Sequence, residues 1–140
     1  PLMDTLAKEA SKLPHHIKFK LMGNRANHEI LDLYKSKPVS LFIHTSETEG
    51  LGMAIVEAQS FGIPAVVIGV GGVVDIVDNR TGIVLNEDCS IEDISLAIKD
   101  AIEKLSVDLV KRQKIKEITM SKFSADNNYQ ELFNKIISGN

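Results

Sequence analysis

The sequence is poor in several features that would point to particular classes of protein. Its 140 residues include a single cysteine, Cys89, so no disulfide can form within the chain, which suits a reducing compartment. No apolar run reaches the roughly 18–20 residues of a membrane span, and no basic segment followed by an apolar one opens the chain as in a signal peptide. The formal net charge of −3 gives no support for nucleic-acid binding. We therefore expect a cytoplasmic protein with no transmembrane segment and no nucleic-acid partner.

Motifs for several other chemistries are missing as well. No glycine-lysine-serine or glycine-lysine-threonine triplet occurs, so the chain has no Walker A loop. Ser46 lacks the Gly-x-Ser-x-Gly elbow of serine hydrolases. None of the histidines stands at a metal-binding spacing from Cys89 or from another histidine, so we expect no metal site. We interpret His44, which follows a predicted strand, as structural, with contact to a substrate as the alternative.

What is present is an ordinary globular composition, with 44% hydrophobic and 25% charged residues, in a chain of the usual length of one domain. Apolar periodicity predicts helices over 2–12, 27–34, 51–61, 73–77, 90–105, 107–121 and 124–137. Alternating or unbroken apolar runs predict strands over 17–22, 39–43, 65–68 and 83–85. Because strands alternate with helices, we expect an α/β fold with a parallel sheet and helices on both faces.

Local signals support several of these boundaries. Asn27 is a candidate N-cap for the helix that follows it. The segment Ser90-Ile91-Glu92-Asp93 resembles a capping box, and residues 78–82, Asp-Asn-Arg-Thr-Gly, have the composition of a turn. These signals depend only on neighbours in the chain, so they locate helix starts and turns without reference to the rest of the fold.

Three glycine-containing loops follow predicted strands, at residues 23–25, 45–52 and 69–72. Right-handed crossovers place the carboxyl ends of parallel strands at one edge of the sheet, where such folds bind their ligands. Glycine lets a backbone approach a ligand closely. The sequence therefore predicts that the three loops converge on a binding site.

The loop over 45–52 and the apolar helix behind it form the most informative stretch. A glycine loop between a strand and a helix start presents free N–H groups and the positive end of the helix to an anion. Glu57 is the only charged residue in the run 51–61, and a buried carboxylate needs a partner or a ligand.

Two interpretations of this stretch stay open from spacing alone. In the functional one, backbone amides near Leu51 to Met53 hold a phosphate, Glu57 accepts hydrogen bonds from a ribose, and Glu49 faces the other end of the ligand. The rise from Glu49 to Glu57 is at most roughly 12 Å, which suits a nucleoside diphosphate sugar. In the structural one, the loop is a plain turn, and Glu57 pairs with a lysine or is exposed.

A second glycine pattern predicts a different ligand. Gly69 and Gly71 match the first two glycines of a dinucleotide fingerprint, but Val74 stands where the third glycine should be. Glu87 and Asp88 end the following strand, where a ribose-binding acid would lie. Because one glycine is missing, we interpret residues 69–72 as a tight loop beside the site.

Residues 46–58, Ser-Glu-Thr-Glu-Gly-Leu-Gly-Met-Ala-Ile-Val-Glu-Ala, strongly resemble the retaining group 1 glycosyltransferases of the GT-B fold. The signature of that family is two glutamates separated by seven residues, here Glu49 and Glu57. Residues 62–66 resemble its Gly-x-Pro-Val-Val segment, 71–77 its Gly-Gly-x-x-Glu-x-Val with Asp for Glu, and 81–84 its Thr-Gly-x-Leu-Val. The resemblance runs from about Ile17 to Leu105, and the consistent order of its segments makes it specific.

The resemblance implies that the chain is the C-terminal, nucleotide-sugar-binding half of a GT-B fold, with a Rossmann-like sheet. It implies that Glu49 is catalytic and meets the hydroxyls of the transferred sugar, and that Glu57 meets the ribose. Backbone after Glu49 would hold the sugar and the diphosphate, and the loop after the first strand would lie near the base. The donor-binding residues that it implies are Gly50, Leu51, Gly52, Met53, Glu57, Gly23, Asn24 and Arg25.

Further properties follow from the same resemblance. Donors in the family are usually UDP-, GDP- or ADP-sugars, and transfer retains the anomeric configuration and generally needs no metal or other cofactor. Acceptors are glycans or lipid-linked molecules, as in polysaccharide biosynthesis, and the full-length protein would work in the cytoplasm or at the inner face of a membrane.

One departure from the family pattern limits what the chain would do alone. The arginine and lysine that serve the diphosphate in the family lie on a strand and loop upstream of the helix matched by residues 2–12, and the acceptor-binding N-terminal domain is absent too. We therefore expect residues 1–140 to be a single partial domain, truncated at its N-terminal side, that does not catalyse transfer alone. The alternatives are a non-catalytic nucleotide- or sugar-binding module and a nucleotide-sugar epimerase of the same architecture.

Overall fold

The computed structural model describes residues 2–46 and 52–124. The chain divides into two compact units, Pro1–Leu33 and Tyr34–Asn140, and each is described by itself. The expectation of one partial domain over the whole chain stays a prediction.

The first unit consists of helix α1, Leu2–Ala10, an irregular segment, and the start of helix α2, Asn27–Ser36. The helix predicted over 2–12 is thus confirmed with a shorter end. The strand predicted over 17–22 is wrong: these residues form neither helix nor strand. A strand exists only where a neighbour satisfies its backbone N–H and C=O groups, and no described strand pairs with this segment. Its apolar side chains Ile17, Phe19 and Leu21 are exposed.

Helix α2 begins one residue earlier than its predicted cap implies. Asn27 is its first helical residue rather than the flanking one. The Glu29 carboxylate accepts a hydrogen bond from the backbone N–H of Ala26 at 3.0 Å, which serves one of the donors that a helix start leaves without an intrahelical acceptor. Glu29 also lies 3.2 Å from the guanidinium of Arg25, so a carboxylate in the first turn anchors the segment that enters the helix.

The second unit contains a parallel sheet of three strands, β1 (Phe42–His44), β2 (Ala65–Ile68) and β3 (Gly82–Leu85), in the order β1-β2-β3. The registers place Ile43 beside Val66, and Val66 beside Ile83. The predictions for the last two strands are confirmed. The strand predicted over 39–43 is shorter and later, because hydrogen bonding to β2 begins only at Phe42.

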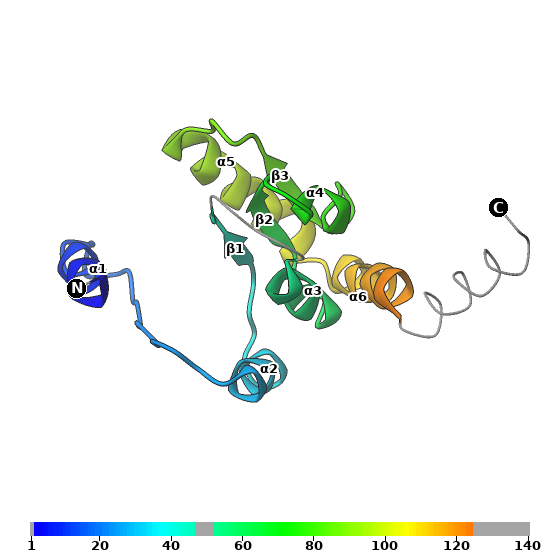
Figure 1. Ribbon diagram of the computed structural model, residues 1–140, viewed down its shortest axis with the longest axis horizontal. Coiled ribbons are helices and arrows are strands. Elements are labelled where there is room, and N and C mark those ends of the chain that lie inside the picture. The colour runs from blue at the N-terminus through cyan, green and yellow to red at the C-terminus, as the bar shows by residue number, and fades with distance from the viewer. Residues whose placement is uncertain (1, 47–51, 125–140) are drawn as a thin grey trace, which may run out of the picture. The chain divides into compact units, whose positions relative to one another are not determined.

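Helices cover both faces of this sheet (Figure 1). Alternate residues of a strand point to opposite faces. Ala65 and Val67 of β2 pack into one core with residues of α3, Met53–Ser60, and α4, Val73–Ile76. Val66 points the other way and packs against Ala97 and Ala101 of α5, Ile91–Ala101. The predicted α/β architecture is therefore confirmed within this unit.

The last described elements are helical. The capping box at the start of α5 is present, with Ser90 Oγ accepting from the Asp93 N–H and the Asp93 carboxylate accepting from the Ser90 N–H. The chain then continues as a π-helical segment, η1 (Ile102–Ser106), and as α6, Leu109–Phe123. Ile115 and Thr119, four residues apart, form the buried stripe of α6. The helix predicted over 124–137 lies almost wholly outside the described residues, and no helix among the described ones is long and apolar enough to span a membrane.

Candidate functional site

Two of the three predicted loops start at the same edge of the sheet. β1 and β2 are parallel neighbours, and His44, the last residue of β1, pairs with Val67, the residue before the end of β2. The loops that leave these strands, 45–52 and 69–72, therefore depart from adjacent strand ends, where α/β folds bind ligands. The loop at 23–25 belongs to the first unit, so its convergence with the other two stays a prediction.

The start of α3 has the backbone geometry that the anion-binding interpretation requires. Gly52 precedes the helix with φ +56° and ψ +35°, in the left-handed region that favours glycine. Its carbonyl accepts the first helical hydrogen bonds, from Ile55 N–H at 2.9 Å and Val56 N–H at 3.3 Å. The earlier amides of a helix have no intrahelical acceptor, and glycine has no side chain to cap them. Met53, the first helical residue, has 56% of its surface exposed, so this helix end faces outward.

Gly52 also fits tightly against the neighbouring loop-and-helix unit. A Cβ at this position would lie 2.9 Å from Ile76 Cδ1, 3.1 Å from Ile55 Cδ1 and 3.6 Å from Val73 Cγ2. Val73 and Ile76 belong to α4, which follows the second glycine loop. The absence of a side chain at residue 52 therefore lets the start of α3 pack closely against α4.

Glu57 lies one turn into α3 and is half-buried, whereas its neighbours Val56 and Ala58 are buried. The alternative in which Glu57 is simply exposed is therefore wrong. Burial, and secondly the negative charge of Glu57, raise the pKa of the phenol of Tyr34 in α2 above its usual value. The Tyr34 ring also contacts Phe61 at the end of α3, with 5.8 Å between ring centroids. Sequence reasoning missed Tyr34, because no local spacing links residues 34 and 57.

Several predicted site residues are described only in part. Glu49, Gly50 and Leu51 lie outside the described residues, so their roles stay predictions. Gly23 has φ +65°, as expected of a glycine in a turn. The Arg25 side chain contacts its own surroundings, with Nε donating to the Met22 carbonyl at 3.0 Å. Gly23 thus has the geometry of a turn, but the strand predicted before it is absent, and the contact of residues 23–25 with a ligand stays a prediction.

His44 ends β1, and Ser46 lies two residues further along the chain. The His44 ring stacks on Phe42, with 6.3 Å between centroids and 25° between planes, and its Nε2 lies 3.4 Å from Ser46 Oγ. Packing of the ring against Phe42 supports the structural interpretation of His44.

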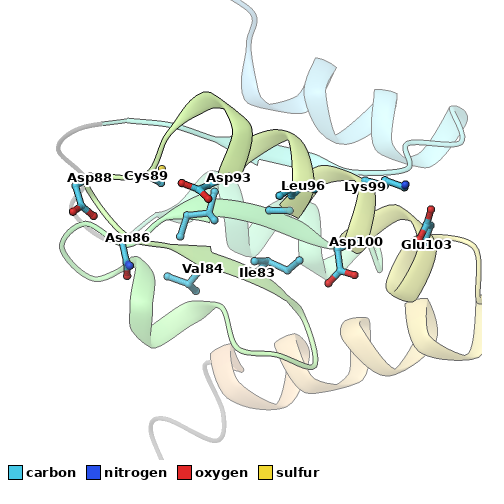
Figure 2. Close-up of a pocket in the computed structure, with 12 residues that line it drawn as sticks. Ile83, Val84, Asn86, Asp88, Cys89, Asp93, Leu96, Lys99, Asp100 and Glu103 are labelled. Atoms are coloured by element: carbon cyan, nitrogen blue, oxygen red, sulfur yellow. The ribbon is translucent and has the colours of Figure 1, made fainter.

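A separate groove of about 760 Å³ lies between β3 and α5. Figure 2 shows Asp88, Cys89 and Asp93 towards one end and Asp100 and Glu103 towards the other. Two of these carboxylates already have partners, since Asp93 caps α5 and Asp100 lies 2.6 Å from Lys104 Nζ. Among the residues that the structure describes, no group of His, Cys, Asp or Glu side chains could hold a metal ion.

Comparison with known proteins places this geometry in a wider context. Residues 1–120 match the family described as glycosyl transferases group 1. A probable sucrose-phosphate synthase of Thermosipho melanesiensis is 35% identical over 98 residues, which are 68% of this chain and 23% of that protein.

Solved structures of HepE from Anabaena share the fold. The structure in complex with UDP and glucose has a TM-score of 0.71 at 24% identity, and the complex with UDP-glucose has a TM-score of 0.68 at 24% identity. Each comparison covers 97% of this chain and 36% of HepE. The chain therefore spans less than half of the length of the proteins that it matches.

Proposed function

This chain belongs to the group 1 glycosyl transferases, and from that premise we propose that it is the donor-binding part of a retaining glycosyltransferase. The full-length protein would transfer a sugar from a nucleoside diphosphate to a glycan or lipid-type acceptor. The observation that carries the proposal is the start of α3, where the left-handed Gly52 and an outward-facing helix end are followed one turn later by the half-buried Glu57.

The chemistry of a nucleotide sugar matches these groups. A helix start offers backbone N–H donors and a positive dipole end to a diphosphate, here from Gly52 and Met53. A carboxylate accepts hydrogen bonds from hydroxyl groups, and Glu57 stands one turn, roughly 6–8 Å, from that helix start, which suits the ribose. HepE, which has this fold, was solved with UDP and with UDP-glucose, and we propose UDP as the first nucleotide to test.

The remaining roles complete the proposed site. Glu49 would meet the hydroxyls of the transferred sugar, Gly50 and Leu51 would add backbone donors, and Gly23 to Arg25 would lie near the base. No metal or other cofactor would be required, because donors at the helix start and cationic groups elsewhere in the full-length protein would stabilise the leaving diphosphate.

We propose that the 140-residue chain does not catalyse transfer by itself. It spans 23% of the length of one relative and 36% of another, and a glycosyltransferase of this architecture needs an acceptor-binding domain as well as a donor-binding one. The full-length enzyme would act in the cytoplasm or at the inner face of a membrane.

An amide-shift titration of the chain with UDP, GDP and ADP tests the donor site. Shift changes confined to Gly23–Arg25, Glu49–Glu57 and Gly69–Gly72, and strongest for one base, would support the proposal. If none of the nucleotides changes these amides, even in a protein extended upstream to include a complete donor domain, the assignment is wrong.

Substitutions in the full-length protein test the enzyme class. We expect Glu49→Ala and Glu57→Ala each to lower the transfer rate, because hydrogen bonds to charged groups contribute roughly 1.5–3 kcal/mol. A matched control is Glu117→Ala on α6, whose carboxylate accepts from Gln113. Nucleotide binding without any transfer would instead indicate a non-catalytic module, and interconversion of free nucleotide sugars would indicate an epimerase.

A further inference from the structure

Helix α2 contributes a tyrosine to the surroundings of Glu57. The Tyr34 ring contacts the Phe61 ring at a centroid distance of 5.8 Å and an interplanar angle of 55°. Phe61 caps the end of α3 and stands four residues after Glu57, and residues four apart share one face of a helix. Tyr34 therefore packs on the same face of α3 that carries Glu57.

The electrostatics agree with this placement. After burial, the negative charge of Glu57 is the second cause that holds the pKa of the Tyr34 phenol above its usual value. The phenol is protonated at neutral pH, so it can donate a hydrogen bond, and the Glu57 carboxylate can accept one. The pair therefore has complementary chemistry and a ring contact that holds the tyrosine in place.

A glutamate that binds a ligand must be held in one conformation. Fixing a glutamate side chain costs rotamer freedom, so packing around the residue that limits its rotamers favours binding. The backbone of α3 is ordered by its own hydrogen bonds, with Ser60 Oγ donating to the Glu57 carbonyl at 2.7 Å. That contact involves the main-chain carbonyl of Glu57 and not its carboxylate.

We propose that Tyr34 is a positioning residue that orients the Glu57 carboxylate towards the ribose hydroxyls of the bound nucleotide. The inference rests on the proposed function, because it requires that Glu57 binds the ribose. The Tyr34 hydroxyl acts through Glu57 and does not itself need to touch the ligand.

The test compares UDP with 2′,3′-dideoxy-UDP, which lacks both ribose hydroxyls, in amide-shift titrations of the whole chain. The measured quantity is the ribose preference, the ratio of the two dissociation constants within one variant. Because the ratio is internal to each variant, a change in the folded fraction cancels. The variants are wild type, Glu57→Gln, Tyr34→Phe and Ser60→Ala. Glu57→Gln keeps the shape of residue 57, and Tyr34→Phe keeps the ring that packs on Phe61.

We expect wild type to prefer UDP about tenfold or more, as one hydrogen bond to a charged group allows, and Glu57→Gln to lose most of that preference. Tyr34→Phe should reduce the preference at least about threefold while its thermal midpoint stays near that of wild type. Ser60→Ala, which also removes one hydroxyl next to Glu57, should keep the wild-type preference.

The outcomes distinguish the proposed role of Glu57 in binding the ribose from the proposed role of Tyr34 in positioning Glu57. If wild type and Glu57→Gln have the same ribose preference, Glu57 does not bind the ribose, and the proposed role of Glu57 falls together with the inference. If Glu57→Gln loses the preference and Tyr34→Phe retains it, the site stands and the role of Tyr34 is overturned. A loss that Ser60→Ala shares with Tyr34→Phe would also overturn it, because the effect would then not be specific to the phenol.

Discussion

Replacing Gly52 by alanine tests the helix start at the centre of the proposed site. The residue has φ +56°, and a residue with a Cβ pays roughly 1–2 kcal/mol in the left-handed region. The new methyl group would meet Ile76 Cδ1 at 2.9 Å and Ile55 Cδ1 at 3.1 Å. Both are the ends of side chains that can rotate, at about 0.5–1.5 kcal/mol for an off-rotamer angle.

One contribution of the Gly52→Ala substitution to the free energy of unfolding has the opposite sign. Alanine restricts the unfolded chain more than glycine does, which stabilises the folded state by roughly 0.4–1 kcal/mol where the backbone is compatible. We therefore expect a net loss of about 1–2 kcal/mol in the free energy of unfolding, measured by urea denaturation followed by circular dichroism at 222 nm. Gly23→Ala is the matched control, since it has φ +65° but no heavy atom within 4 Å of its added Cβ.

The functional readout is the affinity of the Gly52→Ala chain for UDP. Because the substitution moves the first turn of α3 away from Ile76, the amides that would bind the diphosphate shift with it, and we expect at least a tenfold weaker affinity. A loss of stability below about 0.5 kcal/mol, or an unchanged affinity for UDP, would refute the tight packing of Gly52 as the determinant of the helix start.

Three other predictions concern the framework around the site. Gly62→Ala should lower the free energy of unfolding by about 3 kcal/mol or more in urea denaturation, because φ is +73° and the new Cβ would lie 2.5 Å from the backbone oxygen of Arg112, which cannot rotate away; a loss similar to that of Gly52→Ala would contradict this. Asp108→Ala should cost about 1 kcal/mol of stability, because the Asp108 carboxylate accepts from the N–H groups of Val110 and Lys111 at the start of α6, and Asp108→Asn should restore most of it. The N–H and hydroxyl of Ser90 lower the pKa of Asp93 from its ordinary value of 3.8, so the ionised carboxylate stabilises the fold above pH 3.8 and this effect disappears as the pH falls through the lower folded-state pKa. The free energies of unfolding of the chain and of Asp93→Asn, measured against pH, should therefore converge at low pH. A constant difference between the two at every pH would exclude this role of the cap.

Elements governed by local interactions were predictable from the sequence. The capping box of Ser90 and Asp93 joins residues three apart, and the turn at Asp78 is closed by hydrogen bonds to Arg80 and Thr81. The apolar run of β2 identified a strand buried on both faces, and its observed limits, Ala65–Ile68, are those predicted. Family membership was also contained in the sequence, because the order and spacing of several short segments carry it.

Contacts between distant parts of the chain were decided only in three dimensions. The alternating residues 17–22 have the pattern of a strand, yet they form none because pattern alone does not supply a pairing partner. The packing of Gly52 against Ile76 joins residues 24 positions apart, and the ring contact of Tyr34 with Phe61 joins residues 27 positions apart. Neighbours in sequence determine caps, turns and periodicity because those interactions span a few residues, whereas the surroundings of Glu57 depend on which helices the fold brings together.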